Sequence, residues 1–286
     1  MNNIFISSSC GYETVESIIN NSVDKIGLEF GFSLSAEDTD SMVALAKKKE
    51  IPLLAHNYFR PQKGEFVFNL SDPDFENRKA SLDYAVAMVD YCAQNHISSY
   101  SIHSGFACSF SEKHFGQPLS SLPSSSLQTA YDLFIHNLRL LADYAAKKKV
   151  NLLFENNVLT KENISDGQNQ YLLCVTAEDI LYIFSLLGNE NVQLLLDLGH
   201  LNVSCSTLGL SPIEEFYKIA YLIGQIHVHD NDGKSDQHNP VGPVSWFWEL
   251  LLLKNIPLII EQPKAEIDII MSQIMLLREL RSSHVM

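Results

Sequence analysis

Residues 192–200 read VQLLLDLGH, an apolar run that ends at Asp197 and is followed three positions later by His200. Apart from Gln193, the run is apolar on both faces, which is typical of a strand buried in a parallel sheet. An acid and a histidine where such a strand stops suggest that chemistry takes place there. The same pattern recurs along the chain.

Eight short runs rich in Ile, Leu and Val predict eight strands, at 4–7, 25–31, 51–57, 98–104, 150–156, 192–199, 224–230 and 256–262. Between them, apolar residues recur at helical spacing, with Ser35 and Thr176 as predicted N-caps and Gly188 as a stop signal. These patterns predict eight helices, at about 12–21, 35–49, 71–95, 124–149, 176–188, 211–222, 244–254 and 265–281.

Eight strands that alternate with eight helices, without a linker, favour an α/β fold: a closed (β/α)₈ TIM barrel, built as one domain over residues 1–286. An open doubly wound sheet would normally carry a glycine-rich phosphate loop after the first strand. The first predicted strand leads instead into SSSCGYE at 7–13, which has no GxGxxG. The barrel is therefore the preferred prediction.

Charge and composition narrow the class of protein. The net charge of −14 argues against a general nucleic-acid or anionic-membrane surface, although cations can mask acids gathered at a site. Five cysteines without a CxxC pair indicate a reduced compartment, and the N-terminal stretch lacks the features of a secretory signal. No apolar run is long enough to span a bilayer. We therefore expect a cytoplasmic protein without a membrane segment.

The carboxyl ends of seven predicted strands carry acids or histidines, and in barrels of this kind that rim holds the catalytic residues. No cysteine converges with them, so the donors are imidazole nitrogens and carboxylate oxygens. This donor set suits zinc, manganese, iron or cobalt. The residues are Glu29, His56, His103, Glu155, Asp197, His200, His227, His229, Asp236, His238 and Glu261.

Each of these residues has a structural alternative. His56 or His103 alone would more often be a hydrogen-bonded core histidine than a ligand, and Glu29 could equally well bind a neighbouring histidine. Glu155, Asp197 and Glu261 are harder to explain without a cation, because each ends an apolar run and a buried unpaired carboxylate is costly. Of His227 and His229, which point to the same side of a strand, one is a predicted ligand and the other a substrate-orienting residue.

These motifs resemble those of the xylose isomerase-like barrels, which include endonuclease IV and the sugar-phosphate isomerases and epimerases. The resemblance covers most of the chain, from GLEFG at 27–31 to IIEQP at 259–263. FENN is similar to the family's strand-5 glutamate motif, LLLDLGH to its strand-6 Asp-x-x-His motif and LIIEQP to its terminal glutamate motif. HVHDNDGKSDQHNPVGP is similar to the strand-7 histidine followed by Asp-x-His.

The resemblance implies one to three divalent ions, most simply zinc or manganese. In the epimerase branch, one ion is held by the equivalents of Glu155, Asp197, a strand-7 histidine and Glu261, and the equivalent of His200 contacts substrate. In endonuclease IV, three ions are held by nine positions that match His56, His103, Glu155, Asp197, His200, His227, Asp236, His238 and Glu261. The segments FISSSCGYE, HNYFRPQKGEFVFNL and GPVSW depart from that enzyme where it faces DNA.

We therefore expect a metal-dependent isomerase or epimerase of a sugar or sugar phosphate, with Glu155 and Glu261 as acid and base. Arg60 and Lys63, after the third strand, are candidates to hold a phosphate or carboxylate of the substrate, and His200 and His229 are candidates to contact it. The alternative is a multi-metal phosphodiester hydrolase like endonuclease IV, which alone would bring nucleic acid as a partner. A binding module with a decayed metal site is a third interpretation, opposed by the complete ligand set.

Overall fold

The computed structural model describes residues 3–22, 25–61, 67–110, 119–188, 191–252 and 256–282. Eight parallel strands close into a barrel in the order β1-β10-β9-β8-β5-β4-β3-β2, so the predicted TIM barrel is confirmed. Each strand lies within or next to its predicted run. The barrel strands are β1 Ile4–Ser7, β2 Gly27–Phe30, β3 Leu53–His56, β4 Ser99–His103, β5 Asn151–Glu155, β8 Val192–Asp197, β9 Ile223–Val228 and β10 Leu258–Ile260.

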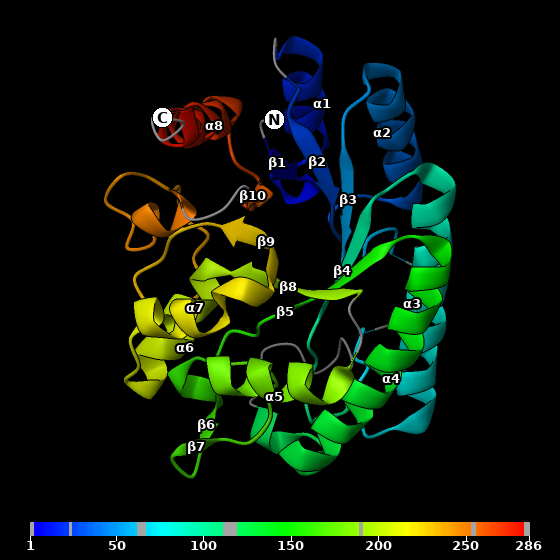
Figure 1. The fold of residues 1–286 in the computed structure, drawn as a ribbon, viewed down its shortest axis with the longest axis vertical. Helices are drawn as coiled ribbons and strands as arrows, with labels where there is room; N and C mark the ends of the chain where they lie inside the picture. Colours follow the sequence, from blue (N-terminus) through cyan, green and yellow to red (C-terminus); the bar gives the residue numbers. More distant parts are fainter. Residues whose placement is uncertain are drawn as a thin grey trace.

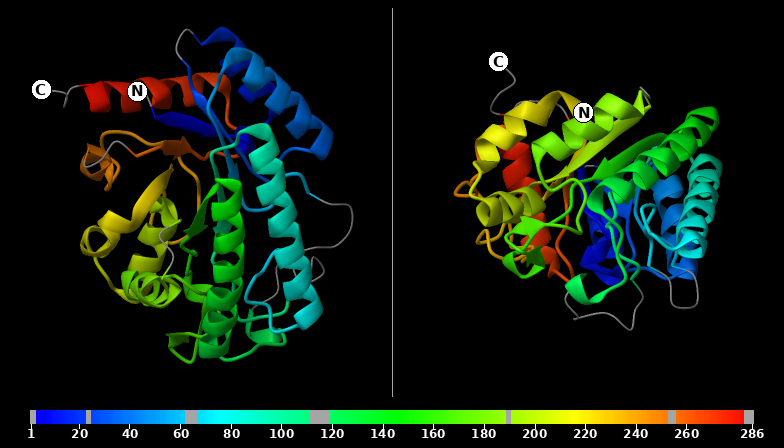
Figure 2. Two further views of the ribbon diagram at one scale, coloured as in Figure 1. Left: turned by 45° about the vertical axis from the view of Figure 1, so that its right-hand side comes forward. Right: turned by 90° about the horizontal axis from the view of Figure 1, so that it is seen from below.

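Helices surround the barrel, with the long α3 and α4 side by side on one flank and α8 next to α1 (Figures 1 and 2). Their caps are those that the sequence indicates: the Ser35 hydroxyl accepts from the Asp38 N–H, and Thr176 forms a capping box with Asp179. The helices are α1 Tyr12–Asn21, α2 Ala36–Lys49, α3 Phe75–Asn95, α4 Leu127–Lys148, α5 Ala177–Leu187, α6 Leu198–Leu208, α7 Pro212–Ile219 and α8 Ile267–Ser282.

Two connections differ from the sequence-based expectation. The segment after β8, where no helix is among the predicted ones, is the helix α6, which Asp197 caps by accepting the His200 N–H. The helix expected at 244–254 is reduced to the 3-10 helix Trp248–Leu252 within the described part of that segment. A small antiparallel hairpin, β6 Ile164–Ser165 with β7 Gln168–Asn169, also lies between β5 and α5.

The interior of the barrel is layered. One buried cluster contains Phe5, Leu54, Leu153, Leu195 and Ile259, one residue from each of five strands, and is separate from the larger core between barrel and helices. Since strand side chains alternate, the residue two positions further along each strand points inward as well. Those positions are Ser7, His56, Glu155, Asp197 and Glu261. The polar rim therefore rests directly on an apolar floor.

No helix in the described ranges has the length and apolar character to cross a membrane.

Candidate metal centre

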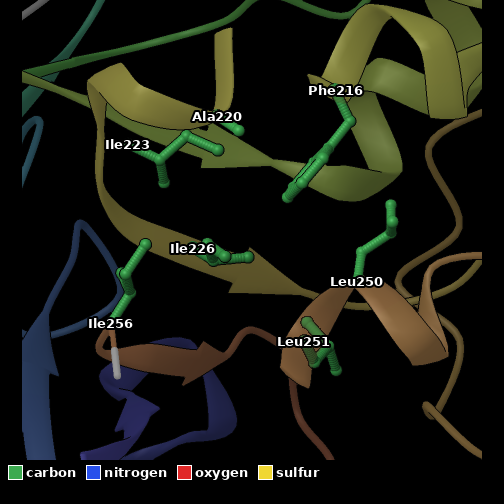
Figure 3. A pocket seen from close by; sticks show the side chains of 7 residues that line it. All are labelled: Phe216, Ala220, Ile223, Ile226, Leu250, Leu251 and Ile256. Carbon is green, nitrogen blue, oxygen red and sulfur yellow. The ribbon is translucent and has the colours of Figure 1, made fainter. Parts of the chain in front are cut away.

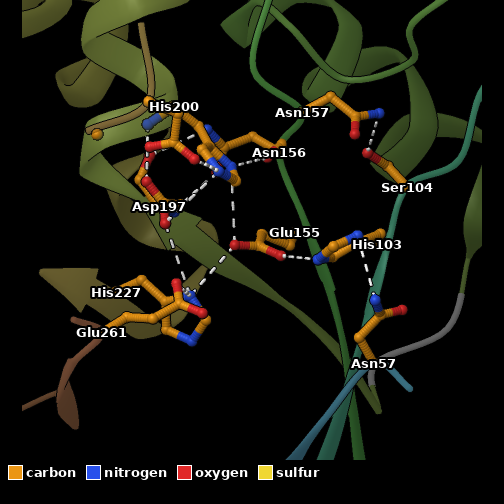
Figure 4. A network of polar contacts seen from close by, with 12 residues as sticks. Asn57, His103, Ser104, Glu155, Asn156, Asn157, Asp197, His200, His227 and Glu261 are labelled. Atoms are coloured by element: carbon orange, nitrogen blue, oxygen red, sulfur yellow. Dashed lines mark hydrogen bonds and ion pairs between the residues drawn. The ribbon is translucent and has the colours of Figure 1, made fainter. Parts of the chain in front are cut away.

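Four side chains meet at the centre of the rim, and we call Glu155, Asp197, His227 and Glu261 the central cluster. Their ligand atoms lie within 4.8 Å of one another, although they come from four strand ends (Figure 4). The Nδ1 atom of His227 is 3.2 Å from Glu155 Oε1, 3.6 Å from Asp197 Oδ2 and 3.1 Å from Glu261 Oε2. Three carboxylates around one ring nitrogen form a preorganised pocket for a cation.

A second group, the His56 cluster, shares Glu155 and adds His56 and His103. The Nε2 atoms of the two histidines are 3.2 Å apart, and they lie 3.4 Å and 3.0 Å from Glu155 Oε2. Glu155 thus faces the central cluster with one oxygen and the His56 cluster with the other. Glu155 could therefore help to hold a cation in either cluster.

The loop after β9 supplies a third group, the Asp236 cluster, which consists of His229, Asp236 and His238. The rings of His229 and His238 stack with centroids 3.9 Å apart, and Asp236 Oδ2 lies 3.1 Å from His238 Nε2. His200, which comes from the first turn of α6 after β8, has its Nε2 3.3 Å from Asp236 Oδ2. The structure therefore places His200 beside the group formed by His229, Asp236 and His238.

Two neighbouring residues, Asn156 and Gly199, help to fix the positions of these side chains. Asn156 donates to the Asp197 carbonyl and accepts the Asp197 N–H, at 3.0 and 2.8 Å, so two strand ends are bound together by one amide. Gly199 lies against the ring of His229, where an added Cβ would be 2.0 Å from His229 Cε1. The glycine of DLGH is thus explained by close packing at the site.

This packing gives a first prediction. Gly199→Ala should displace His229 and lower stability by about 1–3 kcal/mol or more, as overpacking of a dense interior does. Gly242→Ala is the matched control, because an added Cβ there meets nothing within 4 Å. Thermal unfolding of both variants checks the prediction, and equal melting temperatures would contradict it.

The donor set fits a cation on grounds visible in the structure. Four buried atoms of these clusters have no hydrogen-bond partner: Glu155 Oε2, His227 Nδ1, His229 Nδ1 and Asp236 Oδ1. Unpaired buried polar atoms are rare and costly, and bound cations would satisfy such atoms. Clustered buried carboxylates point the same way, because their mutual repulsion needs positive charge to balance it.

The protonation preferences differ from one site residue to the next. Burial disfavours the charge on Glu261, but the neighbouring His227 lowers the pKa of this carboxyl to about 2. Burial also lowers the pKa of His56, which favours the neutral form that metal coordination requires. Burial opposes protonation of His238, yet its hydrogen bond with Asp236 raises its pKa to about 9. A cation would therefore compete with protons there.

A cavity of about 160 Å³ opens onto the clusters, large compared with the about 10–15 Å³ that one water needs. Metal-ligand candidates form one wall, and the ends of β1 and β2 form the other. The lining residues are Ser7, Ser9, Gly31, Phe32, His56, Asn57, His103, Glu155, His200, Asp236, His238 and Glu261. A substrate held there would touch both glutamates.

Two predicted substrate contacts do not fall in this cavity. Arg60 pairs with Asp40 at 2.9 Å and lies over the ring of Tyr91, so its guanidinium contacts α2 and α3 rather than the site. His229 is buried behind the cavity wall, where its Nε2 is 2.9 Å from Asp197 Oδ2. Lys63 lies outside the described residues.

The sequence-based interpretation missed other residues that shape the site. Asn156 directly follows Glu155 and Asn57 directly follows His56, so adjacency was an available signal for both. Ser101 could not be found from the sequence, because it is far from His56 along the chain and its hydroxyl contacts His56 from the neighbouring strand, at 3.0 Å. Phe32 is 66% exposed at the cavity mouth, a position that no periodic pattern marks.

A second cavity lies between β9, α7 and the 3-10 helix Trp248–Leu252 (Figure 3). Its volume is only about 10 Å³, and apolar side chains such as Phe216, Ile226 and Leu250 line it. A void this small and apolar is a packing imperfection rather than a binding site.

Comparisons with known proteins agree with the fold. A search of curated proteins gives no match. Among solved structures, a D-tagatose 3-epimerase-like protein aligns over 99% of both chains with 19% identity and a TM-score of 0.73. The 3-keto-D-glucoside 4-epimerase from E. coli aligns over 98% of this chain and 99% of its own, with 14% identity and a TM-score of 0.67.

A Thermus thermophilus protein soaked with ZnCl2 aligns over 99% of this chain and 100% of its own, with 16% identity and a TM-score of 0.64. At these identities the similarity concerns the fold. The family model described as xylose isomerase-like TIM barrel matches residues 6–280, nearly the whole chain. The chain belongs to the xylose isomerase-like TIM barrel family.

Proposed function

We propose that the protein is a divalent-metal-dependent isomerase or epimerase that acts on a sugar. The observation that carries the proposal is the placement of Glu155 and Glu261, which approach the same ring nitrogen of His227 from β5 and from the segment after β10. Both glutamates line the cavity. The epimerases among the structural relatives support the choice of substrate class.

The central cluster would hold the cation, with zinc or manganese best suited to its nitrogen and oxygen donors. When bound, the cation withdraws electron density from the substrate's adjacent oxygens and so acidifies the carbon-bound proton between them. The carboxylates move that proton. Both are ionised at neutral pH, because the neighbouring histidines overcome the effect of burial and lower their pKa values.

One glutamate can therefore accept the proton from carbon, and the other must gain a proton before it can return one. His200 lines the cavity beside them and is placed to hold a substrate oxygen. Since Arg60 turns away, the cavity-lining residues that the structure describes include neither Lys nor Arg.

One observation favours a second function, a multi-metal phosphodiester hydrolase. The His56 and Asp236 clusters adjoin the central cluster, so three ions could lie together, with Glu155 shared between two of them. Such sites activate water and stabilise the leaving oxygen of a phosphodiester. With both oxygens bound to ions, Glu155 could no longer serve as a base, so the number of ions would decide between the two functions.

The test is a pair of assays on protein loaded with Zn²⁺ or Mn²⁺. We expect ketohexoses such as D-tagatose to exchange a carbon-bound proton for deuterium in D2O, seen by NMR. Hydrolysis of bis(p-nitrophenyl) phosphate without any exchange into the sugars would contradict the proposal and support the hydrolase.

A further inference from the structure

The site histidines differ in what holds the ring nitrogen that faces away from the cluster. For four of them the partner is a neutral group: the Ser101 hydroxyl for His56, the Asn57 amide for His103, the Asn156 carbonyl for His200 and the Glu261 carbonyl for His238. For the other two the partner is a carboxylate: that of Asp197, itself in the central cluster, for His229, and that of Glu29, which lies outside the three clusters, for His227.

The Glu29–His227 pair is fully buried, and both oxygens of the carboxylate lie at the same distance from the ring nitrogen. Both carboxylate oxygens of Glu29 are 3.1 Å from His227 Nε2, and both side chains are 0% exposed. Glu29 reaches His227 through the interior of the barrel, since β1 and β10 lie between their strands. Beneath it, Gly27 leaves room for the ring of Phe5, which an added Cβ would meet at 2.1 Å.

With a cation held by the central cluster beside Nδ1, this contact would fix the tautomer of His227. A neutral imidazole carries one N–H, and a carboxylate on Nε2 keeps the proton there, so Nδ1 presents its lone pair. Nδ1 is the atom that faces the carboxylates of the central cluster. A carboxylate acceptor also makes a histidine ligand more basic than a neutral acceptor does.

We propose that Glu29 is a positioning residue that holds His227 in the Nε2–H form and makes the central cluster the tightest cation site of the three. The inference rests on the metal dependence in the proposed function and deepens it. It also assigns the coordinating atom as Nδ1 in His227. For His56 and His103 the coordinating atom is Nε2, because Nδ1 is already bound to a neutral partner.

A competing role for Glu29 is direct ligation with His56 and His227, since the three can place ligand atoms within 4.8 Å. The contacts oppose it. Nε2 of His56 faces Glu155 at 3.4 Å, and both oxygens of Glu29 are already on Nε2 of His227. The two roles also differ in a measurable way, because a lost ligand lowers the number of bound ions whereas a lost positioning contact lowers the affinity.

The experiment is a calorimetric titration of the stripped, full-length protein with Zn²⁺. Glu29→Gln keeps the shape of the side chain and removes its charge, and we expect the first ion to bind about 10–100-fold more weakly with the number of ions unchanged. Ser101→Ala should weaken a later ion and leave the first unchanged. Glu215→Gln controls for loss of a buried carboxylate, since Glu215 is 3% exposed and accepts from the Ala177 N–H, away from the site.

Ring-nitrogen NMR of the zinc-loaded protein gives a second readout: His227 should be protonated at Nε2 in the wild type and show altered ring-nitrogen shifts in Glu29→Gln. A variant that binds its first ion as tightly as the wild type, or one that loses an ion, overturns the proposal. If the wild type binds no zinc, both this proposal and the metal dependence fail. If it binds zinc without sugar exchange and Glu29→Gln is weakened, this proposal is supported and only the epimerase is lost.

Discussion

Glu155→Gln should reduce the rate of proton exchange into the substrate by about 10²–10⁴-fold, the range expected for a positioned acid or base. The side chain keeps its size but can no longer accept a proton from carbon, and it also brings one charge fewer to the central cluster. Glu261→Gln should cause a loss of the same order, because the second carboxylate faces the same ring nitrogen. The measurement is deuterium exchange at saturating Zn²⁺ or Mn²⁺.

Two controls make the result interpretable. Glu215→Gln removes a buried carboxylate outside the site and should leave the rate unchanged. Circular dichroism should show that the Glu155 and Glu261 variants keep the fold. Wild-type rates in either variant at saturating metal would remove that glutamate from the acid–base pair.

Metal addition should produce the second large effect, on stability and activity together. A ligand present at about 1,000 times its Kd stabilises the folded protein by about 4 kcal/mol, which is roughly 10 °C in melting temperature for a chain of this size. A chelator should reverse both the shift and the activity. Thermal unfolding with and without Zn²⁺ or Mn²⁺ measures the first, and the exchange assay the second.

The number of ions per chain should be obtained from the same samples by elemental analysis. One ion fits the isomerase and leaves one oxygen of Glu155 available to act as a base, whereas three ions fit the hydrolase. No melting shift and no bound ion would contradict the cation sites altogether.

The strands could be predicted from the sequence because a buried parallel strand needs apolar residues on both faces, and nearly every such run ended near a polar rim residue. The helix α6 could not, since Gly199, Asn202 and Ser204 are weak helix formers. The Asp197 cap and the burial of Leu201 between helix and barrel override that weakness. Tertiary context decided this element.

What the sequence could not predict at the site also depends on tertiary contacts. Alternation along a strand places His227 and His229 on the same side, but only the contacts of their rings with Glu29 and Asp197 separate their surroundings. Arg60 follows a strand end closely in sequence, yet its left-handed backbone, with φ of 54°, belongs to a turn in which its side chain pairs with Asp40. The position of a residue in the sequence predicts that it lies near the rim, but it does not predict which way its side chain points.

The central cluster draws its four candidate ligands from residues spread between 155 and 261, and the His56 cluster extends that span back to β3. No short segment of the chain contains the complete central cluster, so a partly folded chain with an open barrel should have little affinity for an ion. Metal binding should therefore act on global unfolding rather than on local opening, slowing the loss of the closed barrel without nucleating its assembly. The ion would therefore bind only the closed barrel and slow its opening. Release of the ion during unfolding would then mark the step at which the barrel opens.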